Sequence, residues 1–304
     1  MMKPIVLISG ANGMVAKSLA LTLYSEYTVR FLTRVVKSAN EFKWDTSTNY
    51  IDPHALQGVN HIIHLAGASI ADQRWTQRRK QDIYSSRVDG AKLIFQELVA
   101  NGQKIDSFIS ASAIGYYGSE TTSQILTEES DNGKDFLADV CNAWEDVAHS
   151  FKSENVAQRT SILRFGIVLG SNKGALKKMV PPIKLGVGAA VGSGTQWVPW
   201  IHVDDISEMV KFLITNEISG TFNAVAPEHI TNNEFTQKLG GVLKRKIAMP
   251  NIPPLFFKLI FGEMAVILLT GSRVSSKKIQ DLGYEFKYAN LHDALRHILA
   301  KKTK

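Results

Sequence analysis

Short apolar runs alternate with longer stretches of helical periodicity through the first half of the chain. The apolar or β-branched runs, which predict strands, are residues 5–9, 28–32, 61–65, 107–112 and 161–165. Between them, apolar side chains recur at helix spacing over residues 14–25, 75–100 and 134–152. Strands joined by helical crossovers predict an α/β fold with a doubly wound parallel sheet.

The pattern changes after residue 170. Glycines and prolines punctuate residues 174–194, which predicts loops over a cleft. Helical periodicity then resumes at 204–215, 232–244, 254–270 and 290–300. We therefore expect one domain over residues 1–170 and a smaller, mainly helical C-terminal lobe over residues 171–304. The alternative is that some segments, including about 195–225, return to the first sheet.

The most apolar stretch is residues 254–270, and Lys258 and Glu263 interrupt it. It falls short of the roughly 20 apolar residues that a membrane crossing needs, so no integral membrane segment is expected. We interpret it as a buried or interface helix, with peripheral membrane contact as the alternative.

Composition narrows the class of protein. The chain has 304 residues, of which 44% are apolar and 21% charged, as is typical of a globular protein with a large core. Its single cysteine, Cys141, cannot form an internal disulfide, and no signal sequence opens the chain, which predicts the cytoplasm. The net charge of +7 is scattered, with a short run only at residues 301–304, so a basic surface is favoured over nucleic-acid binding.

A glycine turn follows the first predicted strand, at Gly10-Ala11-Asn12-Gly13-Met14-Val15-Ala16. In this strand-to-helix context, Gly10 permits the sharp turn and Gly13 lets the backbone approach a pyrophosphate at the helix N-terminus. We expect a Rossmann-type dinucleotide-binding domain in which Gly10, Asn12, Gly13, Met14 and Val15 contact the cofactor.

The end of the second strand predicts which dinucleotide binds. No Asp or Glu follows residues 28–32, where a carboxylate would accept the ribose 2′-hydroxyl of NAD, and Arg34 stands there instead. Arg34 is suited to a 2′-phosphate, so NADP is expected, with NAD as the weaker alternative. The competing interpretation is a surface arginine beside Lys37.

Further motifs extend over nearly the whole chain. They are His64-Leu65-Ala66-Gly67, Ile70-Ala71-Asp72, Arg74-Trp75-Thr76, Ser85-Ser86-Arg87, Ser110-Ala111-Ser112-Ala113-Ile114-Gly115-Tyr116-Tyr117-Gly118, Cys141-Asn142-Ala143-Trp144-Glu145, Trp200-Ile201-His202-Val203-Asp204-Asp205, Gly262-Glu263-Met264 and Leu269-Thr270-Gly271-Ser272-Arg273-Val274. With these motifs the sequence resembles the atypical extended short-chain dehydrogenase/reductases of the NAD-dependent epimerase/dehydratase, or nucleoside-diphosphate-sugar epimerase, family.

The resemblance implies a cofactor along the carboxyl edge of the sheet. Leu65, Ala66 and Gly67 would lie beside its adenosine half, and Arg87 would join the cofactor contacts. The resemblance also implies that the C-terminal lobe, with Glu263, Met264 and Arg273, closes over a substrate. The alternative for those three residues is a helix cap and a packing contact.

The tyrosine and lysine that move the proton in ordinary short-chain reductases are missing. Aligning Glu145 with the glutamate that follows this pair in extended members places Cys141 at the lysine position and Leu137 at the tyrosine position. Ala113 falls at the usual serine position, and Ser112 takes that role after a small shift. Tyr117 is the candidate acid, with aromatic packing as its alternative.

A histidine and two aspartates, His202, Asp204 and Asp205, form the one cluster that resembles a metal site. The resemblance implies a strand-to-helix junction there, in which Asp204 or Asp205 caps the helix, and no metal is expected.

The sequence is compatible with two functions. The first is an NADP-dependent oxidoreductase or epimerase acting on a small hydroxyl or keto compound, sugar nucleotides included. The second is a non-catalytic NADP-binding protein that reports redox state or regulates a partner. A homodimer is left open in both cases.

Overall fold

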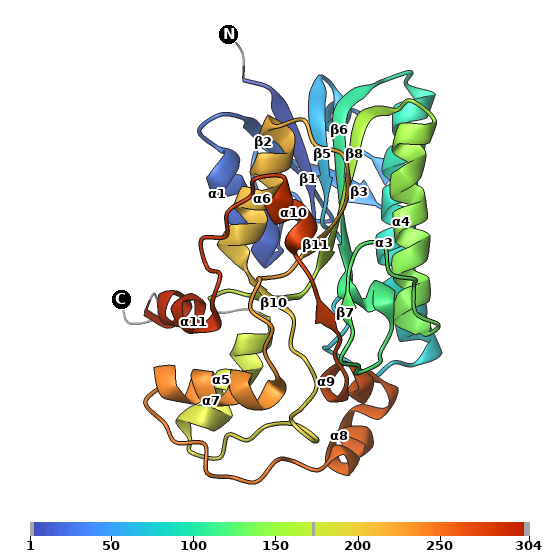
Figure 1. The fold of residues 1–304 in the computed structure, drawn as a ribbon. Coiled ribbons are helices and arrows are strands. Elements are labelled where there is room, and N and C mark those ends of the chain that lie inside the picture. The colour runs from blue at the N-terminus through green and yellow to red at the C-terminus, as the bar shows by residue number, and fades with distance from the viewer. Residues whose placement is uncertain (1–2, 172–173, 301–304) are drawn as a thin grey trace.

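A computed structural model describes residues 3–171 and 174–300, and the basic run 301–304 lies outside the described residues. Its centre is an eight-stranded sheet that is parallel except for its last strand pair (Figure 1). In spatial order the strands are β11 (Gly220–Ala224), β8 (Ala157–Phe165), β6 (Ile105–Ala113), β5 (Val59–His64), β1 (Ile5–Ser9), β2 (Thr28–Thr33), β3 (Glu41–Asp45) and β4 (Tyr50–Ile51). The predicted doubly wound Rossmann fold is confirmed, and all five predicted strands lie in this sheet.

Helices cover both faces of the sheet (Figure 1). On one face, α3 (Gln77–Ala100) and α4 (Phe136–Ser153) bury side chains such as Ile94 and Phe151 against Phe108 of β6. On the other face, α1 (Met14–Leu23) and α6 (Val203–Thr215) bury Leu19 and Met209. Two apolar layers therefore hold the carboxyl ends of the parallel strands in place.

The chain returns to this sheet after residue 170. Strand β11 pairs with β8, with Gly220 opposite Ser161 and Ala224 opposite Phe165. Helix α6 lies on α1, where Ser207 Oγ donates to Ser18 Oγ at 3.0 Å. Residues from α6 to β11 therefore pack in the sheet layers rather than in the C-terminal lobe.

The lobe is mainly helical and has its own apolar cluster, which includes Leu176, Trp200, Phe235 and Leu295. Its helices are α5 (Ala175–Lys184), α7 (Asn232–Val242), α8 (Pro254–Phe261), α9 (Val266–Leu269) and α11 (Leu291–Ala300). The prediction of loops over residues 174–194 was wrong for the segment that forms α5. This segment is helical although it contains Pro181 and Pro182. Its buried residues Leu176, Val180 and Ile183 are the helical signal that the prolines concealed.

Shorter elements complete the described chain. They are α2 (Pro53–Leu56), the 3₁₀ helices η1 (Ile114–Tyr117) and η2 (Gly262–Ala265), α10 (Lys277–Asp281), and the strand pairs β9 (Ile167–Leu169) with β10 (Trp200–His202) and β7 (Ile125–Leu126) with β12 (Arg273–Val274). No helix of the described ranges combines the length and the hydropathy needed to cross a membrane.

The stretch 254–270 is not the one helix that was expected, and its first half is not buried, which leaves the interface interpretation as a prediction. Gly262 adopts φ +60°, which ends α8 and starts η2. In α8, Leu255, Phe256, Leu259 and Ile260 are 57–66% exposed, so none of these large apolar side chains enters the core. Burial resumes only at Met264 and Ala265.

Candidate functional site

The turn between β1 and α1 brings three backbone segments together. Gly10 adopts φ +82°, and a Cβ there would lie 3.2 Å from backbone atoms of Leu65 and Ala66. The Gly13 N–H donates to the Gly10 carbonyl at 2.8 Å, and Gly13 is the N-cap of α1. This geometry requires glycine at position 10 and presents the N-terminus of α1 to the space above the strand ends.

A buried hydrogen-bond chain fixes the end of β5 beside this turn. Ser9 Oγ accepts from the N–H groups of Leu65 at 3.0 Å and Ala66 at 3.1 Å. Ser9 Oγ then donates to Nδ1 of His64 at 2.9 Å, and His64 Nε2 donates to the Arg87 carbonyl at 3.2 Å. The carbonyl can only accept, so His64 carries its proton on Nε2. Burial lowers the pKa of His64 to about 4, which keeps the ring neutral.

A cavity of about 560 Å³ lies over the ends of β1, β2 and β5. Gly10, Asn12, Gly13 and Ala66 line one part of it, and Arg34 and Lys37 line another together with Trp44 and Thr46. Its lining residues within ranges 3–171 and 174–300 include no carboxylate. Two cations and no acid suit the phosphate-rich half of a dinucleotide.

A second cavity of about 500 Å³ continues from the first, because Gly10, Gly13, Leu65 and Gly67 line both. It extends past Met14 and Val15 to the ends of β6 and β8, where Ser112 and Phe165 form part of its wall. All ten residues predicted from the sequence to bind cofactor thus line one continuous trough.

Arg87 reaches this second cavity from α3. Its guanidinium packs beside Gly67, where an added Cβ would lie 3.0 Å from Cζ, and stands 5.4 Å from the Trp144 ring centroid. Nη1 donates to the Ile83 carbonyl at 3.0 Å. Nε and Nη2 have no hydrogen-bond partner among the residues of the described ranges. The trough therefore holds a cation with free donors close to Cys141, the position of the missing lysine.

Ser112 is held by a buried ion pair. Its hydroxyl donates to Glu145 Oε1 at 2.6 Å, and Arg164 binds both oxygens of Glu145 through Nε at 2.9 Å and Nη2 at 2.8 Å. Burial opposes the charge on Arg164, but the hydrogen bonds and attraction of Glu145 raise its pKa above the usual range. The bidentate pair fixes the Glu145 carboxylate behind Ser112.

Tyr117 does not line either cavity, where a proton donor would have to meet a substrate. It is 6% exposed. Its hydroxyl donates to Asn223 Oδ1 at 2.7 Å and accepts from Arg164 Nη1 at 3.0 Å. Burial raises the pKa of Tyr117 to about 12. The geometry therefore argues against the predicted role of Tyr117 as general acid and for its packing alternative.

Cys141 lines the second cavity beside Gly115, as its alignment with the lost lysine predicts. Burial, with the neighbouring Glu145 charge, raises the pKa of this thiol to about 12. A thiol with that pKa stays protonated at neutral pH and is a poor nucleophile.

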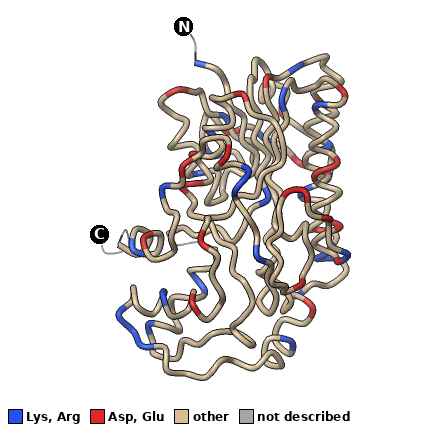
Figure 2. Tube along the Cα trace, viewed as in Figure 1, with Lys and Arg blue, Asp and Glu red and all other residues tan. Residues whose placement is uncertain are grey.

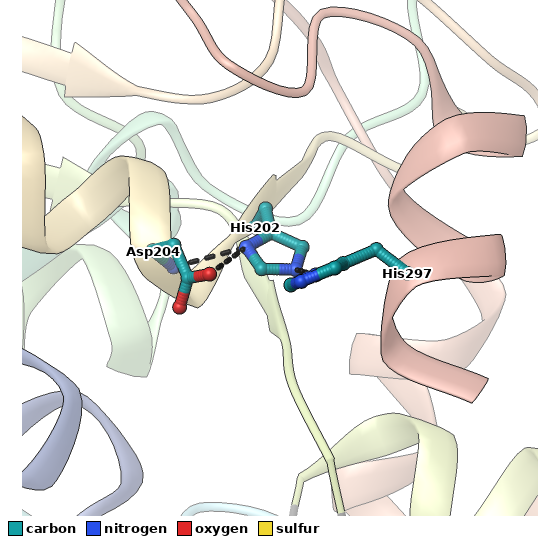
Figure 3. Close-up of side chains that lie close together, drawn as sticks. All are labelled: His202, Asp204 and His297. Atoms are coloured by element: carbon teal, nitrogen blue, oxygen red, sulfur yellow. Dashed lines mark hydrogen bonds and ion pairs between the residues drawn. The ribbon is translucent and has the colours of Figure 1, made fainter. Parts of the chain in front are cut away.

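His202, Asp204 and His297 bring their ligand-type atoms within 4.8 Å of one another (Figure 3). His202 Nδ1 accepts from the Asp204 N–H at 3.0 Å, and His202 Nε2 lies 3.1 Å from Nδ1 of His297. Asp204 and His297 thus approach opposite edges of one imidazole ring, which is unsuitable for a shared metal. The aspartate cap expected here was wrong, since His202 caps α6.

Asp205 instead ties the C-terminal segment to α6. Its carboxylate accepts from the N–H groups of Lys287 at 2.7 Å and Tyr288 at 3.2 Å. Burial is the main reason that the pKa of Asp205 is raised to about 6.

Two of the residues expected to close over a substrate have structural contacts. Glu263 forms an ion pair with Lys80 at 2.6 Å, and Met264 is 3% exposed in a cluster with Trp75. The actual wall on this side of the cavity comes from Ile267, Thr270, Gly271 and Ser272.

A parallel sheet with a glycine turn and a trough along its carboxyl edge defines a dinucleotide-binding Rossmann protein. The profile of the NAD dependent epimerase/dehydratase family matches residues 6–224. The chloroplastic epimerase family protein SDR39U1 homolog of Arabidopsis thaliana is 33% identical over 97% of this chain and 86% of its own length. The chain therefore belongs to the NAD-dependent epimerase/dehydratase family and is an NAD(P)-binding protein. These matches confirm the resemblance that its motifs indicated.

Other relatives agree over the same length. The epimerase family protein SAR0825 of Staphylococcus aureus (strain MRSA252) is 34% identical over 97% of this chain and 99% of its own. The crystal structure of human epimerase family protein SDR39U1 (isoform 2) with NADPH superposes with a TM-score of 0.88 at 27% identity, covering 97% of this chain and 99% of that one. Residues 252–298 match a domain of unknown function, DUF1731.

Sequence reasoning missed several residues that build the trough. Ser9 belongs to no motif, and His64 was noted only as the first residue of His64-Leu65-Ala66-Gly67, yet together they fix the β5 end. Arg164 lies within a predicted strand, and nothing in its local pattern pairs it with Glu145. Trp44 and Thr46 come from β3 and the turn after it, a strand that the apolar pattern did not indicate.

Proposed function

We propose that the protein is an NADP-dependent oxidoreductase that interconverts a hydroxyl and a carbonyl group by reversible hydride transfer. The observation that carries this proposal is the continuous trough along the ends of β1, β2, β5 and β6, with two cations at one end and a buried serine–carboxylate pair at the other. Its dimensions and position suit an extended dinucleotide with a substrate beside it.

The preference for NADP rests on the first cavity. Arg34 and Lys37 line it with no carboxylate among the described lining residues, so a 2′-phosphate would gain charge-assisted hydrogen bonds and meet no like charge from them. The bound NADPH of the human SDR39U1 structure supports the same choice.

Arg87 and Ser112 supply what the missing tyrosine–lysine pair would have supplied. The Arg87 guanidinium, beside Gly67, is placed to donate to the ribose hydroxyls that a lysine at position 141 would bind. Ser112 Oγ directs its proton to Glu145, so a lone pair of Oγ can accept a proton from a substrate hydroxyl. A bound nicotinamide supplies or accepts the hydride.

Proton transfer then runs through side chains of this chain. In the oxidative direction the substrate hydroxyl gives its proton to Ser112 Oγ while the Ser112 proton passes to Glu145 Oε1, and reduction reverses both transfers. Arg164 holds the carboxylate in line by two hydrogen bonds. We place this reaction in the cytoplasm or another reducing compartment, because the sole cysteine is a buried free thiol.

A second candidate is a non-catalytic NADP-binding protein. The specific observation in its favour is that the described cavity wall holds no phenol, and its one thiol has a pKa raised to about 12. Tight NADPH binding with no turnover on any hydroxyl or carbonyl compound would favour this candidate.

The cofactor assignment is tested by titrating NADPH and NADH into wild type and Arg34→Ala. Loss of a charge-assisted contact, about 1.5 to 3 kcal/mol, should weaken NADPH by roughly 10- to 150-fold and leave NADH unchanged. Arg245→Ala, which removes an exposed arginine outside the trough, is the matched control. Equal affinities of wild type for the two cofactors would refute the NADP assignment.

The catalytic assignment is tested with Ser112→Ala. We expect turnover to fall by about two to four orders of magnitude while NADPH affinity stays unchanged, the usual contribution of a positioned proton-transfer group. Ser119→Ala, which alters another serine of the same cavity, should have little effect. Full turnover in Ser112→Ala would remove the Ser112–Glu145 relay from the mechanism.

A further inference from the structure

We propose that the substrate is a small, uncharged and largely apolar carbonyl or hydroxyl compound, and not a nucleoside-diphosphate sugar. This inference rests on the proposed function, in that it takes the second cavity to be the place where substrate meets nicotinamide. It concerns the chemistry of that cavity's wall, which the family's name leaves open.

The wall is mainly apolar, and its polar side chains are Arg87 and the hydroxyls of Ser112, Ser119, Thr270 and Ser272. Its large side chains come from the loop after β5, from α3, from α4 and from the C-terminal lobe, and they include Ile70, Ile83, Leu137, Val140 and Ile267. The described lining residues contain no Asp, Glu, Lys or His, and Arg87 is their one cation. A diphosphate carries two or more negative charges, and moving it into such a wall without matching cations would be costly.

Three cations near this wall have contacts that join the two parts of the molecule. On the segment that continues from Ile70, Arg74 donates to the Ile260 carbonyl at 2.6 Å and Lys80 pairs with Glu263 at 2.6 Å. Lys178 of α5 reaches across to the Ala71 carbonyl at 2.7 Å. These contacts join the lobe to the Rossmann domain, so recruiting the three cations for a phosphate would break that connection.

Arg273 does not supply the missing charge either. It follows Ser272 in the chain, but its guanidinium lies 5.1 Å from the Trp197 ring centroid. It lines a separate cavity of about 10 Å³ beside Glu228 and His229, which is too small for a phosphate group.

Volume leads to the same conclusion. The second cavity, of about 500 Å³, must hold the nicotinamide and its ribose as well as the substrate. Arg87 packs on Gly67, which lines both cavities, and the proposed function uses its donors for the ribose of the cofactor. What remains for substrate is the apolar part of the cavity between Leu137 and Ile267.

The test measures binding to the NADPH-loaded protein, so it does not depend on turnover. Acetophenone and cyclohexanone represent apolar carbonyl compounds, UDP-glucose represents nucleoside-diphosphate sugars, and pyruvate represents keto acids. Each is titrated by calorimetry into wild type, Leu137→Asn and the matched control Leu259→Asn. Leu137 lines the cavity, whereas Leu259 is 66% exposed on α8 and outside it.

We expect the apolar ketones to bind wild type and the Leu259→Asn control alike, and to bind Leu137→Asn about tenfold more weakly, as a polar group replaces a buried apolar one. UDP-glucose and pyruvate should bind at least tenfold more weakly than the ketones. Tighter binding of UDP-glucose or pyruvate, or failure of both ketones to bind, would overturn the inference. A protein that takes up no NADPH at all would refute the proposed function instead, which keeps the two failures distinct.

Discussion

The buried His64 makes a pH-dependent contribution to stability that can be calculated. Its pKa is about 4 in the folded protein against a usual value of 6.5, because the ring is fully buried. Since the folded-state pKa is depressed, the unfolded chain binds the proton first. The stability from neutral His64 is therefore complete above pH 6.5 and is lost as pH falls toward 4. The difference corresponds to about 3 kcal/mol over the whole window and about 2 kcal/mol between pH 7.5 and pH 5.

The perturbation that isolates this effect is His64→Gln, compared with wild type by urea unfolding at several pH values. Every other titrating group is common to both proteins. The opposite slope from Asp205, whose pKa is raised to about 6, thus cancels in the difference. Wild type should lose about 2 kcal/mol relative to the variant on going from pH 7.5 to pH 5. Parallel curves over that range would show that His64 titrates normally and that the Ser9–His64–Arg87 chain is not as the structure describes it.

The remaining predictions concern the site. Tyr117→Phe should leave turnover within about twofold of wild type and lower the free energy of unfolding by about 1 to 2 kcal/mol, because Arg164 and Asn223 each lose a buried partner. Turnover assays and urea unfolding check this, and a hundredfold loss of turnover with unchanged stability would return Tyr117 to the mechanism. Gly13→Val should abolish NADPH binding measured by calorimetry while the circular dichroism spectrum is retained, because even a Cβ there lies 3.1 Å from the Gly10 carbonyl. Unchanged affinity in the folded variant would place the pyrophosphate elsewhere.

The sheet could be predicted because its strands are buried on both faces. Continuous apolar runs and alternating helices are what a parallel sheet with two covered faces requires, and the five predicted strands are its central part. The glycine turn was equally readable, because its backbone geometry depends on residue types within one short segment. Strand β3, next to the edge strand β4, buries fewer side chains, as the half-buried pattern of Glu41, Phe42 and Asp45 shows, and carries a weaker signal.

The chemistry of the site was harder to predict because it depends on pairs distant in sequence. Glu145 and Arg164 lie on different elements, and their bidentate contact, with the Ser112 hydroxyl bound to Glu145, exists only in the tertiary structure. Tyr117 was a reasonable candidate by chain position, since it follows β6 directly. The turn of η1 directs it toward Asn223 instead, and a local pattern contains no information about that rotation.

The pairing of the basic side chains also depends on contacts between residues that are distant in sequence. Lys and Arg are distributed over both parts of the molecule with Asp and Glu among them (Figure 2), in line with the scattered basic residues of the sequence. What the sequence does not reveal is which cations are already paired. The assignment of Arg74, Lys80 and Lys178 to contacts between the lobe and the Rossmann domain comes from tertiary structure alone.

The return of α6 and β11 to the sheet means that the chain cannot be dissected into two folding units at residue 170. A fragment ending there would lack β11, and the edge of β8 that faces β11 would lose its ladder partners from Ser161 to Phe165. It would also uncover the apolar face of α1 that Met209 and Val210 of α6 now bury. An open strand edge beside an exposed apolar surface is a template for intermolecular pairing, so such a fragment is expected to aggregate rather than fold as an autonomous cofactor-binding domain.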